Sequence, residues 1–160
     1  MMIPGQATII PRYMMFFSVG LYDTLWALIL PSFFSISSIF LLRQFYLGLP
    51  NDLMEAARVD GGSNFQIWSR ILLPLTKPAM VTVTVLSFIS SWNEYLSALI
   101  FLPSNKNYTV SLGVQYWMQM TDEYNLMMAA AAGTILPIIV LFIATQKYFV
   151  ESIATTGVKG

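Results

Sequence analysis

Apolar residues form long runs along this chain, and charged residues interrupt these runs at only a few points. Two stretches, 24–42 and 124–146, contain no charge, and a third contains only Glu94. A helix needs about 20 apolar residues to cross a bilayer core roughly 30 Å thick. The pattern therefore predicts membrane-spanning helices over 24–42, 78–101 and 125–146.

The first residues and two internal prolines complete this pattern. Residues 1–20 are mostly apolar but contain two prolines and Arg12, and we interpret them as a partial span. Pro31 and Pro137 lie inside predicted spans, where neighbouring groups in a membrane can satisfy the carbonyl that a proline frees. The alternative, buried helices of a large soluble protein, would need a long polar segment to cover them.

Composition supports the membrane assignment and excludes several functions. Of the 160 residues, 56% are hydrophobic and 10% are charged, whereas soluble domains carry about 25% charged residues. The absence of Cys and His excludes disulfides, thiolate metal sites and His-based catalysis. Eight basic residues balance eight acidic ones, so we expect no nucleic-acid partner. We predict an all-α membrane protein that is not an enzyme and holds no cofactor or metal.

Basic residues concentrate in two segments, which predicts the orientation in the membrane. They are Arg43, Arg58, Arg70 and Lys77 in the central loop, and Lys147 and Lys159 in the tail. By the positive-inside rule, the loop 43–77 and the tail 147–160 are cytoplasmic. The loop 102–124, with one lysine and two acidic residues, is then external.

The central loop has the sequence pattern of two short helices joined by a glycine turn. Asn51 or Asp52 is placed to cap the first helix, and Asp52-x-x-Glu55 has capping-box spacing. Gly61-Gly62 provides the stop expected after a helix. Ser63-x-x-Gln66 repeats the capping-box spacing and opens a second helix that we expect to end at Pro74.

These residues resemble a known motif. The sequence Glu55-Ala56-Ala57, three residues, Gly61, nine residues and Ile71-x-Leu73-Pro74 reproduces the spacing of the EAA motif, which marks the permease subunits of bacterial-type ABC importers. The similarity covers essentially the whole chain. It resembles the carbohydrate-uptake branch, and within it the second permease subunit of the maltose-transporter type. Such subunits have six spans, and the resemblance implies that this chain is a C-terminal portion beginning partway through the third.

The resemblance implies a function and a set of partners. The chain would be part of a permease in a bacterial plasma (inner) membrane that imports a sugar. It would pair with a second permease, receive solute from an extracytoplasmic binding protein, and be driven by two cytoplasmic subunits that bind ATP and Mg. Two alternatives are import of a polyol or glycerophosphodiester-like solute, and a channel or scaffold subunit that needs no ATPase.

The EAA loop supplies the first group of candidate site residues. The resemblance implies that its first helix is a coupling helix that docks on an ATPase subunit through Glu55, Ala56, Ala57, Asp60 and Gly61. Glu55 has a rival role as the capping partner of Asp52 within the helix. Asp60 has structural alternatives as well, because it could cap the second helix or steady the Gly61 turn.

A polar sequence near the end of the second span supplies the other group. Trp92, Asn93, Glu94 and Tyr95 combine aromatic faces with amide and carboxylate groups, which are typical of sugar-binding sites. A carboxylate at membrane depth usually faces a bundle interior or a watery path. We therefore place these four residues on a candidate translocation path. The alternative is an interfacial aromatic belt with an acid that reaches the headgroups.

Overall fold

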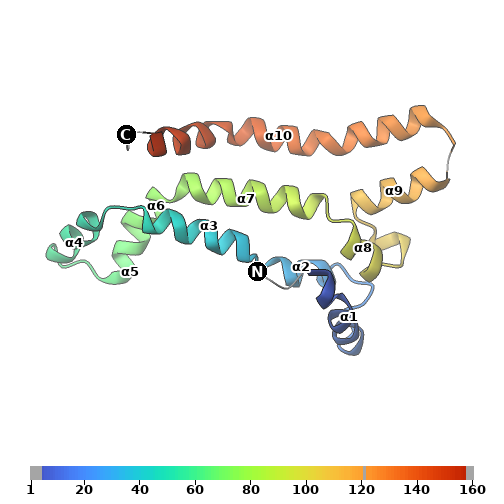
Figure 1. Ribbon diagram of the computed structural model, residues 1–160, viewed down its shortest axis with the longest axis horizontal. Coiled ribbons are helices and arrows are strands. Elements are labelled where there is room, and N and C mark those ends of the chain that lie inside the picture. The colour runs from blue at the N-terminus through green and yellow to red at the C-terminus, as the bar shows by residue number, and fades with distance from the viewer. Residues whose placement is uncertain (1–4, 121, 158–160) are drawn as a thin grey trace. The chain divides into compact units, whose positions relative to one another are not determined.

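The computed structural model describes residues 5–120 and 122–157, and all regular secondary structure in this part of the chain is helical, without a strand (Figure 1). The predicted all-α membrane fold is confirmed. The helices are α1 (Ile9–Ser18), α2 (Trp26–Ser32), α3 (Ile36–Leu47), α4 (Asn51–Val59), α5 (Asn64–Ile67), α6 (Leu73–Leu75), α7 (Lys77–Trp92), α8 (Leu96–Phe101), α9 (Val110–Met120) and α10 (Tyr124–Gly157). Short 3₁₀ turns cover Gly5–Thr8 and Asn105–Asn107, and a π-helical turn covers Trp68–Leu72.

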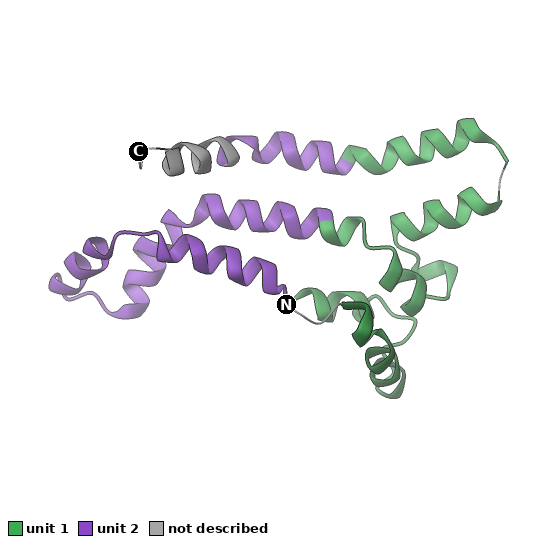
Figure 2. Cartoon of the chain, in the orientation of Figure 1, with its two compact units in different colours: residues 1–34, 90–136 green, residues 35–89, 137–160 purple. Residues whose placement is uncertain are grey.

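The chain divides into two compact units, shown in separate colours in Figure 2. Unit 1 contains residues 1–34 and 90–136, and unit 2 contains residues 35–89 and 137–160. Each candidate site lies within one unit. The polar sequence at 92–95 belongs to unit 1, and the EAA loop belongs to unit 2.

Two segments of the described chain are long and apolar enough to cross a membrane. They are Trp26–Leu47 and Tyr124–Tyr148. A third is possible if Asn64–Leu75 and Lys77–Trp92 form one span, but these two helices are bent by 68° at Thr76. Pro78 explains this bend, because its ring excludes the carbonyl four residues earlier and it has no N–H to donate.

The sequence over 24–42 does not form one uninterrupted helix. α2 ends at Ser32, just after Pro31, and α3 begins at Ile36. Ser35 has an extended backbone, and its hydroxyl accepts a hydrogen bond from the amide of Ser38 at 3.2 Å, so it is the N-cap of α3. The hydrogen bond that Ser35 accepts therefore starts a new helix at a point where the mean hydropathy of 24–42 predicts one continuous helix.

α10 is the longest helix and contains Pro137. The indole N–H of Trp92 donates a hydrogen bond to the carbonyl of Thr134 at 3.0 Å. Thr134 lies three residues before the proline, in the turn that a proline ring distorts. A side chain from α7 thus donates to a carbonyl in the turn of α10 that precedes Pro137.

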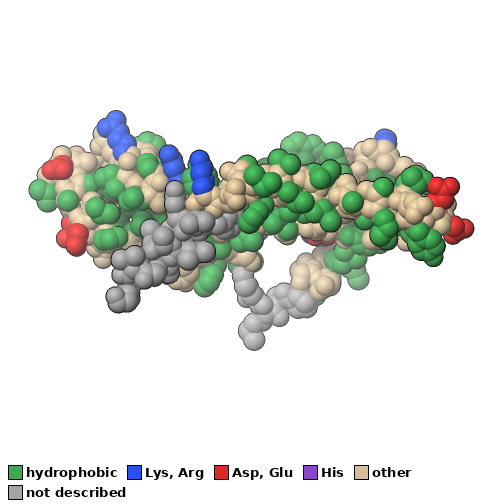
Figure 3. Space-filling model, turned by 90° about the horizontal axis from the view of Figure 1, so that it is seen from above, with side chains coloured by type: hydrophobic (Ala, Val, Ile, Leu, Met, Phe, Trp, Pro, Cys, Tyr) green, Lys and Arg blue, Asp and Glu red, His purple; other side chains and the backbone are tan. Residues whose placement is uncertain are grey.

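Small buried clusters hold unit 1 together. Phe16 of α1, Ala27 of α2 and Phe101 of α8 form one cluster, and Ala98, Leu102 and Leu112 form a second. Large apolar side chains elsewhere are exposed, including Phe34 at 80% and Val59 at 88%. Figure 3, the view onto α10, shows hydrophobic side chains over much of its surface. An apolar surface of this extent needs lipid or other protein to cover it.

Candidate functional site

The first candidate site is the loop formed by α4, the glycine turn and α5 (Figure 1). α4 begins at Asn51, its N-cap is Pro50, and no side chain caps it. The predicted capping by Asn51 or Asp52, with Glu55 as the box partner, is therefore wrong. Because Pro50 has an extended backbone (ψ 131°), the helix starts directly after it and places both polar residues inside the first turn.

The glycine turn closes α4 with a Schellman motif. The amide of Gly62 donates to the carbonyl of Ala57 at 2.9 Å, and the amide of Gly61 donates to that of Arg58 at 3.0 Å. Gly61 has a φ of +79°, which side chains rarely adopt. A Cβ on Gly62 would lie 2.8 Å from the Ala57 carbonyl oxygen. Both glycines are thus required by the backbone, and the predicted turn is present.

Ser63 and Gln66 begin the second helix as their spacing predicts. The Ser63 hydroxyl accepts from the Gln66 amide at 3.3 Å, and the Gln66 side chain accepts from the Ser63 amide at 2.9 Å. Asp60 does not cap this helix but is the C-cap of α4. The helical run continues past Pro74 to Leu75, because the π-helical turn Trp68–Leu72 widens the backbone where the proline cannot donate.

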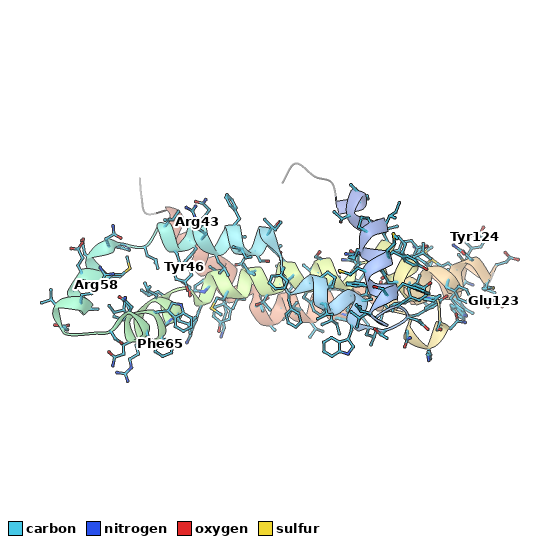
Figure 4. All side chains as sticks on the ribbon, turned by 90° about the horizontal axis from the view of Figure 1, so that it is seen from below. Arg43, Tyr46, Arg58, Phe65, Glu123 and Tyr124 are labelled. Carbon is cyan, nitrogen blue, oxygen red and sulfur yellow. The ribbon has the colours of Figure 1, made fainter. Side chains whose placement is uncertain are left out.

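The loop presents the EAA residues at its surface. Glu55, Ala56 and Asp60 are exposed, and Ala57 is half-buried. Asp60 and Gly61 line an open hollow of about 380 Å³, together with Ala57, Gly62, Gln66, Ile67, Arg70 and Ile71. Glu55 does not contribute to this hollow. Figure 4 shows Arg58 and Phe65 projecting from the loop, and Phe65 is 71% exposed.

The second candidate site divides between two cavities of unit 1. Trp92, Asn93 and Tyr95 line a cavity of about 440 Å³ with side chains of α9 and α10. Glu94 lines a separate cavity of about 290 Å³. The helix ends at Trp92 and α8 begins at Leu96, so the non-helical residues between them direct successive side chains into different spaces. The structure therefore does not bring the four predicted residues into one site.

Glu94 also organises the backbone at this break. Its Oε1 accepts a hydrogen bond from the amide of Ser97 at 2.8 Å, which satisfies one of the free donors in the first turn of α8. The hydroxyl of Ser111 donates to the Glu94 carbonyl at 2.9 Å. Glu94 thus has a structural role beside any role in a translocation path.

Arg12 is a residue of this cavity that the sequence reasoning missed. Its Nη2 donates to the Ser97 hydroxyl at 3.0 Å, and its guanidinium lies over the Phe101 ring, 4.6 Å from the centroid. Four serines complete the polar lining: Ser32, Ser90, Ser91 and Ser97. Arg12 had a signal in the sequence, because a charge inside an apolar stretch usually faces a polar interior.

Asp23 is a second polar centre of unit 1 that was not predicted. It has a φ of +57° and accepts hydrogen bonds from the amide and hydroxyl of Ser104 and from the Asn107 side chain. The Ser104 hydroxyl, followed by Asn107, lowers the pKa of the Asp23 carboxyl below its usual range. These contacts tie the start of the 102–124 loop to the α1–α2 connection.

Comparison with known proteins identifies the family. Residues 1–155 match the family described as binding-protein-dependent transport system inner membrane component. The chain belongs to this family. It is thereby a multi-pass membrane protein, and the predicted permease family is confirmed. Within the described residues, no group of His, Cys, Asp or Glu is placed to hold a metal ion.

Several individual relatives are similar along the whole chain. An arabinooligosaccharides transport system permease protein, AraQ, of Halalkalibacterium halodurans is 35% identical over 161 residues, which is 100% of this chain and 58% of the relative. An sn-glycerol-3-phosphate transport system permease protein, UgpE, of Brucella abortus is 33% identical over 98% of this chain and 56% of its own length. The chain thus spans little more than half the length of these permeases.

A solved structure has the same fold. A bacterial ABC transporter involved in the import of the acidic polysaccharide alginate matches with a TM-score of 0.70 and 26% identity. The match covers 88% of this chain and 56% of the transporter chain. The fold is therefore shared with a chain of a solved ABC transporter, over about half of that chain's length.

Proposed function

We propose that this chain is part of a permease subunit that imports a sugar or a related polyhydroxylated solute with energy from ATP. The observation that carries the proposal is the family match over residues 1–155. The arabinooligosaccharide, glycerol-phosphate and alginate systems among the relatives all move hydroxylated solutes. The partners are a second permease, an extracytoplasmic solute-binding protein and two cytoplasmic ATPase subunits, which hold ATP and Mg. The EAA loop and the C-terminus then face the cytoplasm.

In this proposal the EAA loop transmits force between the ATPase and the spans. A loop that transmits force has to be rigid. The Schellman turn fixes the end of α4, and the Ser63 capping box fixes the start of α5. Ala56 is small and exposed, so another protein can approach the α4 backbone closely. Glu55 is exposed beside it and free of the capping role, which leaves its carboxylate available for a basic group of the ATPase.

Asp60 and Gly61 line the open hollow of the EAA loop. A partner side chain that entered the hollow would contact the turn directly. The C-cap position of Asp60 fixes its backbone, while its exposed side chain remains accessible. We assign to these two residues the role of holding α4 in the orientation that docks.

The test is ATP-driven uptake by the complete importer in proteoliposomes with the variant Glu55→Ala. Removal of one member of a desolvated charge pair costs roughly 2–5 kcal/mol, so we expect uptake to fall at least about tenfold and the ATPase to co-purify poorly. Asp122→Ala, an exposed acid outside the EAA loop, is the matched control and should transport normally. Unchanged uptake and co-purification in Glu55→Ala would contradict the coupling role.

A further inference from the structure

Arg12 and Glu94 place two opposite charges in the lining of one cavity of unit 1. It has a volume of about 290 Å³, near the lower end of the range for ligand pockets. Its walls combine these charges and four serines with apolar side chains of α2. Burial of charged groups beside apolar walls is costly unless something pairs with them.

Arg12 has donor capacity that the protein does not use. One nitrogen donates to Ser97, but Nε is buried and has no hydrogen-bond partner, the only such side-chain atom among the described residues. An unpaired buried donor costs about 1–3 kcal/mol. The stacking of the guanidinium on Phe101 fixes its plane, so its remaining N–H groups keep a defined direction.

Glu94 offers the complementary acceptor. Its Oε1 is occupied by the Ser97 amide, whereas Oε2 receives no hydrogen bond from the residues that the structure describes. Ser97 therefore contacts both charged groups, Arg12 through its hydroxyl and Glu94 through its amide. The cavity thus has a charged donor and a charged acceptor on either side of a single serine.

This arrangement favours a neutral solute with adjacent hydroxyl groups. One hydroxyl oxygen can accept from Arg12 while a neighbouring hydroxyl donates to Glu94, so one diol satisfies both charges. The two charges sum to zero. An anionic group would gain from Arg12 but be repelled by Glu94, and a cationic group would meet the reverse.

We propose that Arg12, Glu94 and Ser97 form a subsite for a neutral polyhydroxylated solute, and that Glu94 excludes acidic solutes from it. The proposal rests on the proposed import function and deepens it, because relatives of this chain serve both neutral and acidic solutes. It assigns Arg12 as the donor and Glu94 as the acceptor of the subsite.

The test uses the absence of native cysteine in the chain. Ser90→Cys places a thiol in the cavity lining, and its labelling by a neutral thiosulfonate reagent is measured on the assembled importer without ATP. The probes are glucose, arabinose, maltose and glycerol, and the acids glucuronate, galacturonate and glycerol 3-phosphate. We expect at least one neutral probe to slow labelling about threefold or more, and no acid to do so.

The charge of Glu94 is tested in the same background. Glu94→Gln should allow at least one acid to protect the thiol, while Glu123→Gln, which removes a carboxylate that does not line this cavity, should leave the pattern unchanged. Two results would overturn the proposal. One is that, with Glu94 intact, an acidic probe protects the Ser90→Cys thiol as strongly as any neutral probe does. The other is that no probe protects it. Because labelling needs no ATP hydrolysis, its failure is distinguishable from a failure of ATP-driven uptake.

Discussion

Asp23 shows how one side chain positions a loop of this permease. Its carboxylate receives hydrogen bonds from Ser104 and Asn107, and its own amide donates to the carbonyl of Phe101 at 2.9 Å. The backbone of Asp23 lies in the left-handed region, which aspartate tolerates better than most residues. A change at this position affects the connection before α2 and the loop after α8 together.

The lowered pKa of Asp23 predicts how this contact depends on pH. A carboxyl whose pKa is lower in the folded state adds stability that is complete above its unfolded pKa of about 3.9 and is lost as the pH falls through the lowered value. We expect the Ser104 amide to remain protected from hydrogen exchange between neutral pH and about pH 5, and to lose protection only in stronger acid.

Asp23→Asn tests this in the complete subunit. The variant cannot accept from both the amide and the hydroxyl of Ser104 as a carboxylate does, so protection should be lower at neutral pH and independent of acidification. Asp122→Asn is the control and should retain the native profile. Equal protection in Asp23→Asn and the native protein would show that the carboxylate does not hold the loop.

At the scale of elements, the breaks between helices position the candidate sites more than the helices themselves. The break at 93–95 separates Glu94 from Trp92 and Tyr95 into different cavities. The Ser35 cap interrupts the apolar stretch 24–42, and the Trp92 side chain supports the α10 turn near Pro137. At the two breaks, a side-chain oxygen of Ser35 or Glu94 accepts a hydrogen bond from a backbone amide of the following helix.

Two variants of the glycine turn test whether it holds the two helices of the EAA loop together. Gly61→Ala meets no atom within 4 Å but forces alanine into a φ of +79°, at a cost of about 1–2 kcal/mol. Gly62→Ala has no such φ cost but must move the Ala57 carbonyl, 2.8 Å from the new Cβ. Hydrogen exchange of the loop amides should rise about fivefold or more for each of the two variants.

Gly113→Ala is the control for this pair, because its Cβ meets nothing within 4 Å and the residue lies inside α9. It should leave exchange of the EAA loop unchanged. If Gly61→Ala and Gly62→Ala behaved like Gly113→Ala, the Schellman turn would not be what holds the loop.

At the scale of the whole chain, the sequence predicts local features better than distant contacts. The Ser63–Gln66 box and the glycine turn follow from spacing within a few residues, and both are present. The spacing predicts Asn51 or Asp52 as the cap of α4, but Pro50 already supplies the extended residue before the helix, so both polar residues lie inside its first turn. Capping signals that lie side by side cannot be ranked from the sequence alone.

The Arg12–Ser97 contact joins residues 85 positions apart, and no local pattern indicates it. Hydropathy averages also hide the Ser35 break, because a few serines scarcely change the mean of a long apolar stretch. The family, by contrast, was recognisable from the EAA spacing, since that pattern extends over a short segment whose geometry is fixed by its own caps and turn.

If the EAA loop docks on an ATPase subunit, a cysteine on α4 should cross-link to that subunit. The chain contains no cysteine, so Ala56→Cys gives a single reactive site on α4. In the complete importer, a short thiol-to-amine cross-linker should join this position to the ATPase, with a yield that changes when ATP is added. Val110→Cys, exposed in unit 1, should give no such product. Equal ATPase cross-linking from both positions, or none from Ala56→Cys in an importer that still transports, would show that the EAA loop does not dock on the ATPase.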